Sequence, residues 1–337
     1  MLETKNLKVE CRLCLNQRLK AESCSICQDS CHLNAIVVDD STGSISINDQ
    51  CNACGLCVNS CPSQAFSWTN TTRYPLQCKD GSVNIYCQKV NCEGYVQCLA
   101  NLNVYELVYL ALHRELTIYI DTQECNNCNI AVMAMVKSIC QDVNEFLKKI
   151  DKSIINLQYK QKADLENVNR RQFFSVLFTK LKQSVIETLP LPTEVTDYRS
   201  LVIEEINKLA LAENSDAAPL FWGMKVSDKC AMCGMCTKIC KNNALRLIEV
   251  GLNGSLQYNQ DRCIGCGACI KLCPTKAMEI SKSYSRLGSI GKEKFTTVNT
   301  CLLTKCRVCK SNFIDRQETG LCDSCQRKAA NKPQAIY

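Results

Sequence analysis

Cysteine is the residue type with the most chemical potential in this chain, because it occupies 29 of 337 positions. Residues 51–66 read CNACGLCVNSCPSQAF and space four cysteines as C-x2-C-x2-C-x3-C-P. In this spacing a tight loop brings three thiolates to one [4Fe-4S] cluster, and the fourth cysteine turns toward a second cluster. The run therefore predicts a pair of clusters whose remaining ligands lie elsewhere in the chain.

A partner run lies upstream, where Cys24, Cys27 and Cys31 follow each other in C-x2-C-x3-C order. Ala21 stands where the first cysteine of the pattern is expected, so Cys11 or Cys14 must complete the set, and we expect Cys14. The predicted ligands of one cluster are Cys14, Cys24, Cys27 and Cys61, and those of the other are Cys31, Cys51, Cys54 and Cys57.

A competing interpretation treats the upstream cysteines as a zinc site made of two C-x2-C pairs, Cys11 with Cys14 and Cys24 with Cys27. This alternative leaves Cys61 without a cluster. The crossed arrangement uses every thiolate except that of Cys11, and we therefore favour it.

The same device recurs in CAMCGMCTKICKNNAL at 230–245 and DRCIGCGACIKLCPTKAMEI at 261–280. Crossed ligation predicts a third cluster on Cys230, Cys233, Cys236 and Cys273, and a fourth on Cys240, Cys263, Cys266 and Cys269. His32 and Lys241 replace the proline that follows the fourth cysteine, whereas Pro62 and Pro274 keep it. We expect these departures to affect loop rigidity and potential more than ligation.

Composition and charge restrict the setting. Clusters need free thiols, no run of about eighteen apolar residues exists, and the opening MLETKNLKVE lacks an apolar stretch, which together predict a cytoplasmic protein without a membrane span. The formal charge of +7 counts every cysteine as neutral. Ligating thiolates are ionised, and four clusters with one zinc site bring the total to about −3, which argues against a nucleic-acid partner.

The middle of the chain, residues 75–140, carries scattered cysteines between segments that predict a βαβ unit: a strand at 82–87, a helix at 103–115 and a strand at 116–120. Asn103 and Glu106 form a candidate capping box for that helix. The carboxyl ends of parallel strands meet at one sheet edge, so a fifth redox centre, [2Fe-2S] or another metal, is predicted there. Its candidate ligands are Cys87, Cys98, Cys125 and Cys128, with Cys92 as an additional candidate and Cys78 farther away; inert buried thiols are the alternative.

Two segments remain. Val143, Phe146, Leu147, Ile150 and Ile154 form an apolar stripe that begins a helical linker. In the tail, Cys306, Cys309, Cys322 and Cys325 are spaced C-x2-C-x12-C-x2-C, which predicts a structural zinc site, with a rubredoxin-like iron site or a nucleic-acid-binding ribbon as the alternatives.

These motifs resemble a bacterial family of 4Fe-4S dicluster, polyferredoxin-like electron-transfer proteins. The central residues 86–128 are similar to the small iron-sulfur subunit of hydrogenase and heterodisulfide reductase complexes, whose cysteines hold a [2Fe-2S] centre. The resemblance implies an α+β chain in which two ferredoxin-like dicluster modules flank a small α/β segment and a helical linker, with a zinc ribbon at the C-terminus. The expected parts are 1–72 and 226–285 for the modules, 73–140 for the α/β segment, 141–225 for the linker and 300–328 for the ribbon.

The resemblance also implies a carrier that passes electrons between larger redox proteins, such as a dehydrogenase or a reductase. The chain offers few residues for catalysis of its own. It has only two histidines for acid-base chemistry, and its one G-x-G, at Gly265 and Gly267, lies inside a cluster motif and does not indicate a dinucleotide site. We therefore predict no catalytic residue. The alternatives are an oxidoreductase subunit with a substrate site at the central cysteines, and an interaction protein that senses oxygen or iron.

Overall fold

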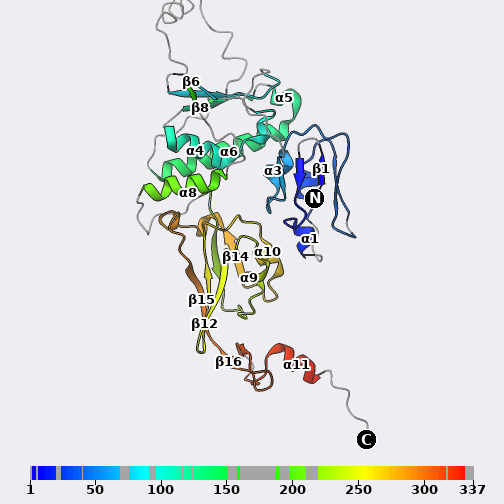
Figure 1. Ribbon diagram of the computed structural model, residues 1–337, viewed down its shortest axis with the longest axis vertical. Helices are drawn as coiled ribbons and strands as arrows, with labels where there is room; N and C mark the ends of the chain where they lie inside the picture. Colours follow the sequence, from blue (N-terminus) through cyan, green and yellow to red (C-terminus); the bar gives the residue numbers. More distant parts are fainter. Residues whose placement is uncertain are drawn as a thin grey trace, which may run out of the picture.

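The computed structural model describes residues 2–4, 7–19, 24–39, 41–68, 76–79, 81–90, 96–114, 117–122, 124–150, 158–159, 187–189, 197–209, 219–315 and 318–330. Figure 1 shows an N-terminal module, an α/β unit, a second module and a small C-terminal tail. Within these ranges, no helix has both the length and the apolar character that crossing a bilayer requires.

The N-terminal module is built from two short strand-helix-strand halves. Its elements in chain order are β2 (Leu7–Val9), α2 (Ile26–Asp29), β3 (Ile36–Val38), β4 (Ile45–Ile47), α3 (Leu56–Ser60) and β5 (Phe66–Trp68). The outer strands β2 and β5 pair antiparallel, as do the inner strands β3 and β4. Val9, Ile36, Ile45 and Phe66 are buried between the halves. β1 (Leu2–Thr4) extends the outer pair, and α1 (Leu15–Leu19) lies between Cys14 and Cys24.

The second module repeats this order. Its elements are β11 (Gly223–Val226), α9 (Met235–Ile239), β12 (Leu245–Val250), β13 (Asn253–Tyr258), α10 (Ala268–Leu272) and β14 (Met278–Ser281). β11 pairs with β14 and β12 with β13, both antiparallel. β15 (Thr296–Leu302) adds a third strand beside β13, after the single turns η3 (Lys282–Tyr284) and η4 (Leu287–Ser289). The tail holds β16 (Thr304–Lys305), β17 (Asn312–Phe313) and α11 (Asp323–Ala330).

The α/β unit contains a five-stranded sheet in the order β10-β6-β7-β8-β9. Its strands are β6 (Leu76–Lys79), β7 (Ser82–Ile85), β8 (Thr117–Ile120), β9 (Gln158–Tyr159) and β10 (Glu187–Leu189). β7 and β8 are parallel and are joined through η1 (Leu99–Asn101) and α4 (Val104–Arg114), so the predicted βαβ unit is confirmed. The capping box is confirmed too: Tyr105 N donates to Asn103 Oδ1 at 2.8 Å, and Asn103 N to Glu106 Oε2 at 3.5 Å.

Helices α4, α6 (Ile130–Lys149) and α8 (Tyr198–Lys208) share the core of this unit. The described part of the predicted stripe is buried, since Val143, Phe146, Leu147 and Ile150 all lie in that core, and Ile154 lies outside the described residues. α6 starts before the expected boundary at 140/141 and runs through it, and β9 and β10 come from the expected linker and complete the sheet. The described residues from 141 to 209 therefore belong to the α/β unit, because an apolar helix face needs a partner to cover it, whereas Gly223–Val226 form β11 of the second module. Residues 160–186 of the expected linker lie outside the described residues.

Candidate metal centres

The four cysteine runs share one backbone geometry after their last cysteine. The third residue beyond that cysteine is left-handed, at Asn34, Gln64, Asn243 and Lys276, with φ of 50°, 54°, 50° and 49°. The next residue is an alanine whose N–H donates back to the sulfur, over 3.3 to 3.4 Å, in the pairs Ala35–Cys31, Ala65–Cys61, Ala244–Cys240 and Ala277–Cys273. Because positive φ is uncommon in residues other than glycine, this repeat marks one specific loop. His32 and Lys241 do not disturb it.

The predicted ligands of the first cluster lie together, and we call Cys14, Cys24, Cys27 and Cys61 set I. Burial, together with the nearby thiols of Cys61, Cys14 and Cys24, raises the pKa of Cys27 to about 12. Cys14 is buried in the module core, whereas Cys11 is half-buried at its margin. The structure thus places Cys14 close to the other three cysteines of set I.

Set II comprises the predicted ligands of the second cluster, Cys31, Cys51, Cys54 and Cys57. These four cysteines line one cavity beside α3. Burial raises the pKa of Cys57, and the thiols of Cys54, Cys51, Cys27 and Cys31 add to the rise. Because Cys27 belongs to set I, a thiol of set I also raises the pKa of a thiol in set II.

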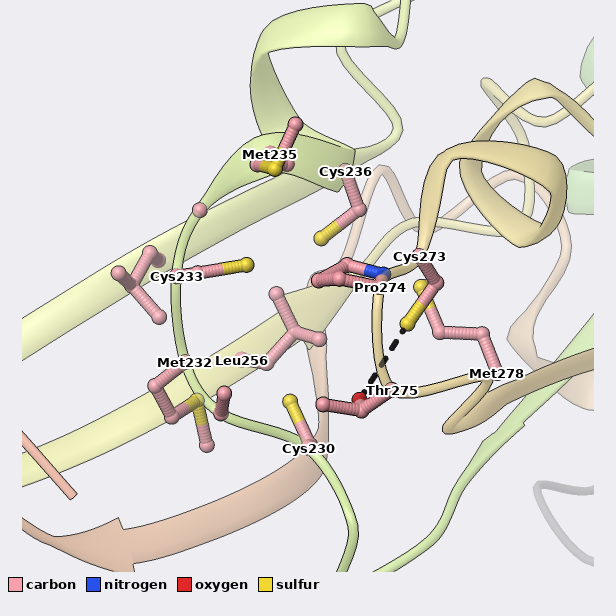
Figure 2. Close-up of a pocket in the computed structure, with 13 residues that line it drawn as sticks. Cys230, Met232, Cys233, Met235, Cys236, Leu256, Cys273, Pro274, Thr275 and Met278 are labelled. Atoms are coloured by element: carbon pink, nitrogen blue, oxygen red, sulfur yellow. Dashed lines mark hydrogen bonds between the residues drawn. The ribbon is translucent and has the colours of Figure 1, made fainter. Parts of the chain in front are cut away.

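The second module holds two corresponding sets. Set III is Cys230, Cys233, Cys236 and Cys273, and set IV is Cys240, Cys263, Cys266 and Cys269. Figure 2 shows the four sulfur atoms of set III turned toward one cavity that these residues line together with Leu256 and Pro274. Burial raises the pKa of Cys269 to about 12, with contributions from Cys263, Cys266 and Cys240 of set IV and from Cys236 of set III.

The donor sets have the chemistry that iron-sulfur clusters need. Each offers four thiols at a partly apolar site, and burial with mutual repulsion keeps several of them protonated. An iron-sulfur cluster bound here would take these residues as thiolates, and its cationic iron core would offset the repulsion among them. At Cys273, burial raises the pKa, but bonds from the Ala277 N–H and the Thr275 hydroxyl outweigh it and lower the pKa overall.

The central cysteines also meet, at the carboxyl ends of the two parallel strands. Cys87 follows β7, and Cys125 and Cys128 bound α5 (Cys125–Cys128) after β8. Burial raises the pKa of Cys98 to about 12, and the thiols of Cys54, Cys87 and Cys125 contribute. We call Cys87, Cys98, Cys125 and Cys128 set V. Cys78 pairs with Val83 near the start of β7, away from set V, and Cys92 lies outside the described residues.

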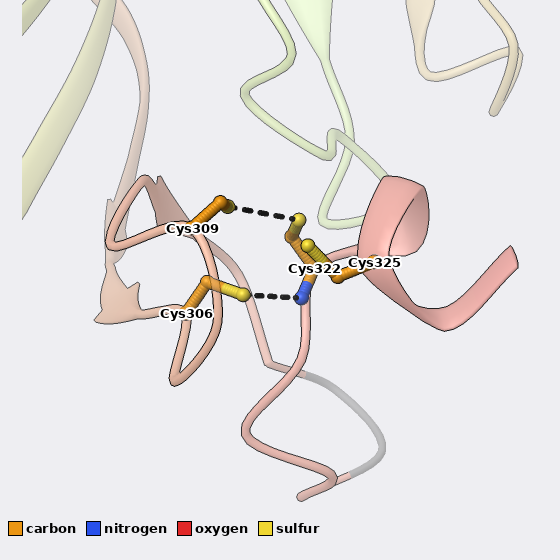
Figure 3. Close-up of side chains that lie close together, drawn as sticks. All are labelled: Cys306, Cys309, Cys322 and Cys325. Atoms are coloured by element: carbon orange, nitrogen blue, oxygen red, sulfur yellow. Dashed lines mark hydrogen bonds between the residues drawn. The ribbon is translucent and has the colours of Figure 1, made fainter. Parts of the chain in front are cut away.

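The four tail cysteines form the tightest group. The sulfur atoms of Cys306, Cys309, Cys322 and Cys325 all lie within 4.8 Å of one another (Figure 3). Hydrogen bonds from the backbone N–H groups of Cys322 and Cys309 lower the pKa of Cys306 to about 6. The Ser311 hydroxyl lies 2.9 Å from Cys309 Sγ and lowers the pKa of that thiol. Four thiols at this spacing suit a closed tetrahedral ion.

Two basic residues near the sites were missed by the sequence analysis. Lys89 Nζ donates to Cys128 Sγ over 3.1 Å. Arg199 of α8 donates to the carbonyl oxygens of Gln260 at 3.3 Å and Cys263 at 3.0 Å, and to that of Asp261. Neither has a spacing signal, because Lys89 lies 39 residues from Cys128 and Arg199 lies 64 residues from Cys263 in the chain.

Comparison with known protein families agrees with this geometry. The 4Fe-4S dicluster domain matches residues 229–277, and the 4Fe-4S binding domain matches residues 45–67. The chain therefore carries two ferredoxin-type iron-sulfur domains, which support a role in electron transfer. The upstream cysteines at 11–31 lie outside the matched ranges. No curated protein matches the chain.

Proposed function

We propose that this protein is a one-electron carrier that holds four [4Fe-4S] clusters, on sets I to IV, and relays electrons between larger redox proteins such as a dehydrogenase and a reductase in a reducing cytoplasm. The proposal is supported by the way in which the cysteine runs of each module combine. The last cysteine of each run lies with the first three cysteines of the other run, so that two four-cysteine sets form in each module. A [4Fe-4S] cluster accepts and returns single electrons, and the protein sets its potential through burial and hydrogen bonds to sulfur.

This chain's own residues supply those two controls. The repeated alanine N–H bonds to Cys31, Cys61, Cys240 and Cys273 place a donor on one ligand of every cluster. Donors at sulfur stabilise the more negative, reduced state and raise its potential. Half-burial of most ligands limits the access of water.

Metal analysis of anaerobically prepared protein, with EPR of the reduced state, tests the proposal. We expect about 16 iron atoms from the four clusters of sets I to IV, with matching sulfide, and any iron on set V comes in addition. After full reconstitution, fewer than about 12 irons would contradict the N-terminal pair of sites.

The choice of the fourth ligand in set I has its own test. Cys14→Ser should remove or convert one cluster, whereas Cys11→Ser, three residues away, is the matched control and should leave the iron content unchanged. Equal and complete loss in both variants would favour the zinc interpretation of the upstream cysteines.

We also propose a [2Fe-2S] centre on set V. It is supported by the convergence of four thiols at one sheet edge and by the Lys89 ammonium group, which offsets thiolate charge at Cys128. Changing Cys125 and Cys128 together to serine should lower the iron content by about two and remove a [2Fe-2S] EPR signal. Cys78→Ser, in β6 opposite Val83 near the start of β7, is the control. A steady-state assay in which set V turns over a substrate would favour the oxidoreductase alternative.

For the tail we propose structural zinc on Cys306, Cys309, Cys322 and Cys325. The segment has little apolar core, with two two-residue strands and one short helix, so metal binding is expected to supply its folding free energy. One zinc per chain, retained after iron removal, is the expected result.

A further inference from the structure

The departure from the usual motif in the first run coincides with a contact between the two modules. In the second module, two residues separate Cys230 from Cys233, whereas nine residues separate Cys14 from Cys24. Part of that longer interval forms α1, which lies against α10 of the second module (Figure 1). The insertion therefore gives the N-terminal module a helix that the repeated fold does not need.

The contact is apolar at its centre. Leu15 and Leu19 of α1 and Ala268 of α10 are 3%, 9% and 1% exposed and form one cluster. At its margin, Arg18 donates to the carbonyl oxygen of Ile239, the last residue of α9. Three side chains of α1 thus hold the two modules together.

The same cluster includes a cysteine from each module. Cys24 of set I and Cys266 of set IV both pack against Leu15, Leu19 and Ala268. The Asn16 side chain fixes the position of Cys24, because its Nδ2 donates to Cys24 O at 2.9 Å and its Oδ1 accepts from Cys24 N at 2.5 Å. α1 therefore both carries the contact and orients the ligand that faces it.

The remaining cysteine sets lie on either side of this contact, set III in the second module and sets II and V on the side of the first module and the α/β unit. Sets III and IV share the core of the second module, and sets I and II share that of the first. Cys54 of set II and Cys98 of set V pack against the core of the α/β unit, where Asn59 of α3 also donates to Leu102 O at 3.0 Å. Among the cysteines of sets I to V, all of which the structure describes, Cys233 and Cys128 alone are exposed. When the sets are ordered by their contacts as III, IV, I, II and V, Cys233 belongs to the first set and Cys128 to the last.

We propose that α1 is an inter-module electron-transfer junction, which holds set I beside set IV and makes the five sets one series from Cys233 to Cys128. This inference rests on the proposed function, since it requires clusters on the sets. One electron leaves the centre on one side, which is oxidised, and arrives at the other, which is reduced; no bond or proton changes. The competing arrangement is two modules that serve separate partners.

Pulsed EPR on the full chain, reduced with dithionite, tests the junction. Serine at Cys54 and Cys57 and at Cys233 and Cys236 removes sets II and III and leaves one [4Fe-4S] site per module beside set V. We expect a dipolar splitting between the [4Fe-4S] centres of sets I and IV in this background. Arg18→Glu places a carboxylate against the carbonyl oxygen of Ile239, and Leu19→Glu puts one into the apolar cluster, so either should abolish the splitting at unchanged iron content.

Arg12→Glu is the matched control, because Arg12 is exposed and lies six residues before Arg18. The substitution changes the charge by the same amount, and this variant should retain the dipolar splitting. The second module is also held to the α/β unit by Arg199 and by the Lys282–Asp142 ion pair at 2.6 Å, so the variants should keep their fold. The comparison of Arg18→Glu with Arg12→Glu in the otherwise unchanged chain, read as the spin-relaxation rate of the reduced centres, does not depend on the serine background.

Three results would overturn the junction. They are no splitting in a background protein that holds both [4Fe-4S] centres, a splitting that survives both Arg18→Glu and Leu19→Glu, or equal relaxation rates in Arg18→Glu and Arg12→Glu. Any of these with normal iron content leaves the carrier function intact. A protein without iron overturns both proposals, and the two failures are therefore distinguishable.

Discussion

Adding a methyl group at Gly55 tests how the N-terminal module is seated on the α/β unit. Gly55 lies between Cys54 and Cys57 of set II, at the start of α3, with φ of 87°. A Cβ atom there would lie 2.0 Å from Asn101 Oδ1 of η1 and 2.2 Å from Trp68 Cζ2 of β5. Gly267, the equivalent glycine of set IV, has φ of 74° and nothing within 4 Å of its Cβ position. Comparison of Gly55→Ala with Gly267→Ala therefore separates the cost of the left-handed backbone from the cost of the steric contacts.

The expected magnitudes follow from these two contributions. A left-handed alanine costs about 1–2 kcal/mol, and this is the whole effect expected for Gly267→Ala. Gly55→Ala has the same backbone cost and must also displace a tryptophan ring and an asparagine, which adds about 1–3 kcal/mol of overpacking. Its total is thus about 2–5 kcal/mol. Trp68 belongs to the same module as Gly55 and Asn101 to the α/β unit, so the extra cost falls partly inside the N-terminal module and partly on its contact with the α/β unit.

Thermal loss of cluster absorbance, at one scan rate and matched iron content, compares the variants. The scan rate is held constant because cluster loss makes unfolding irreversible. We expect the transition of Gly55→Ala to lie clearly below that of Gly267→Ala, with both below the unchanged protein. Gly81→Ala, with φ of 70° and open space around its Cβ, provides the backbone cost away from any cluster. An equal or larger effect at Gly267 would refute the reasoning.

Three further outcomes are expected. Phe146→Ala empties a fully buried position in α6 and should destabilise the α/β unit by about 3–5 kcal/mol, measured as a lower unfolding temperature; a change below about 1 kcal/mol would contradict the core assignment. Asn103→Ala removes the cap of α4 and should cost about 1 kcal/mol, whereas Asn103→Ser should retain most of the stability. Cys322→Ser should release the tail zinc without changing the iron content, and iron loss in that variant would argue against a separate metal site.

The local parts of the fold were predictable because their determinants lie close together in the chain. The βαβ unit follows from alternation in its first strand and helical apolar spacing after Asn103, and the capping box needs two residues three positions apart. The stripe from Val143 to Ile150 likewise identified the buried face of α6. In each case one short pattern carries the information.

The limits of the α/β unit were not predictable in this way. The expected boundary at 140/141 was placed where cysteines stop, but α6 continues through it because its apolar face covers the same core on both sides. β9 and β10 join the sheet from 158–159 and 187–189, at opposite edges. Such pairings depend on backbone hydrogen bonds between distant segments, which leave little trace in two or three residues.

By itself, the sequence determined which cysteines form each run, because C-x2-C-x2-C-x3-C spacing and the left-handed residues of its loop are local properties. Tertiary structure alone decided that Cys14 rather than Cys11 lies with Cys27 and Cys61, and that α1 joins the two modules. The physical reason is the same for both. Thiols and leucines far apart in the chain meet only after packing has closed the loops between them, and residue spacing does not encode that closure.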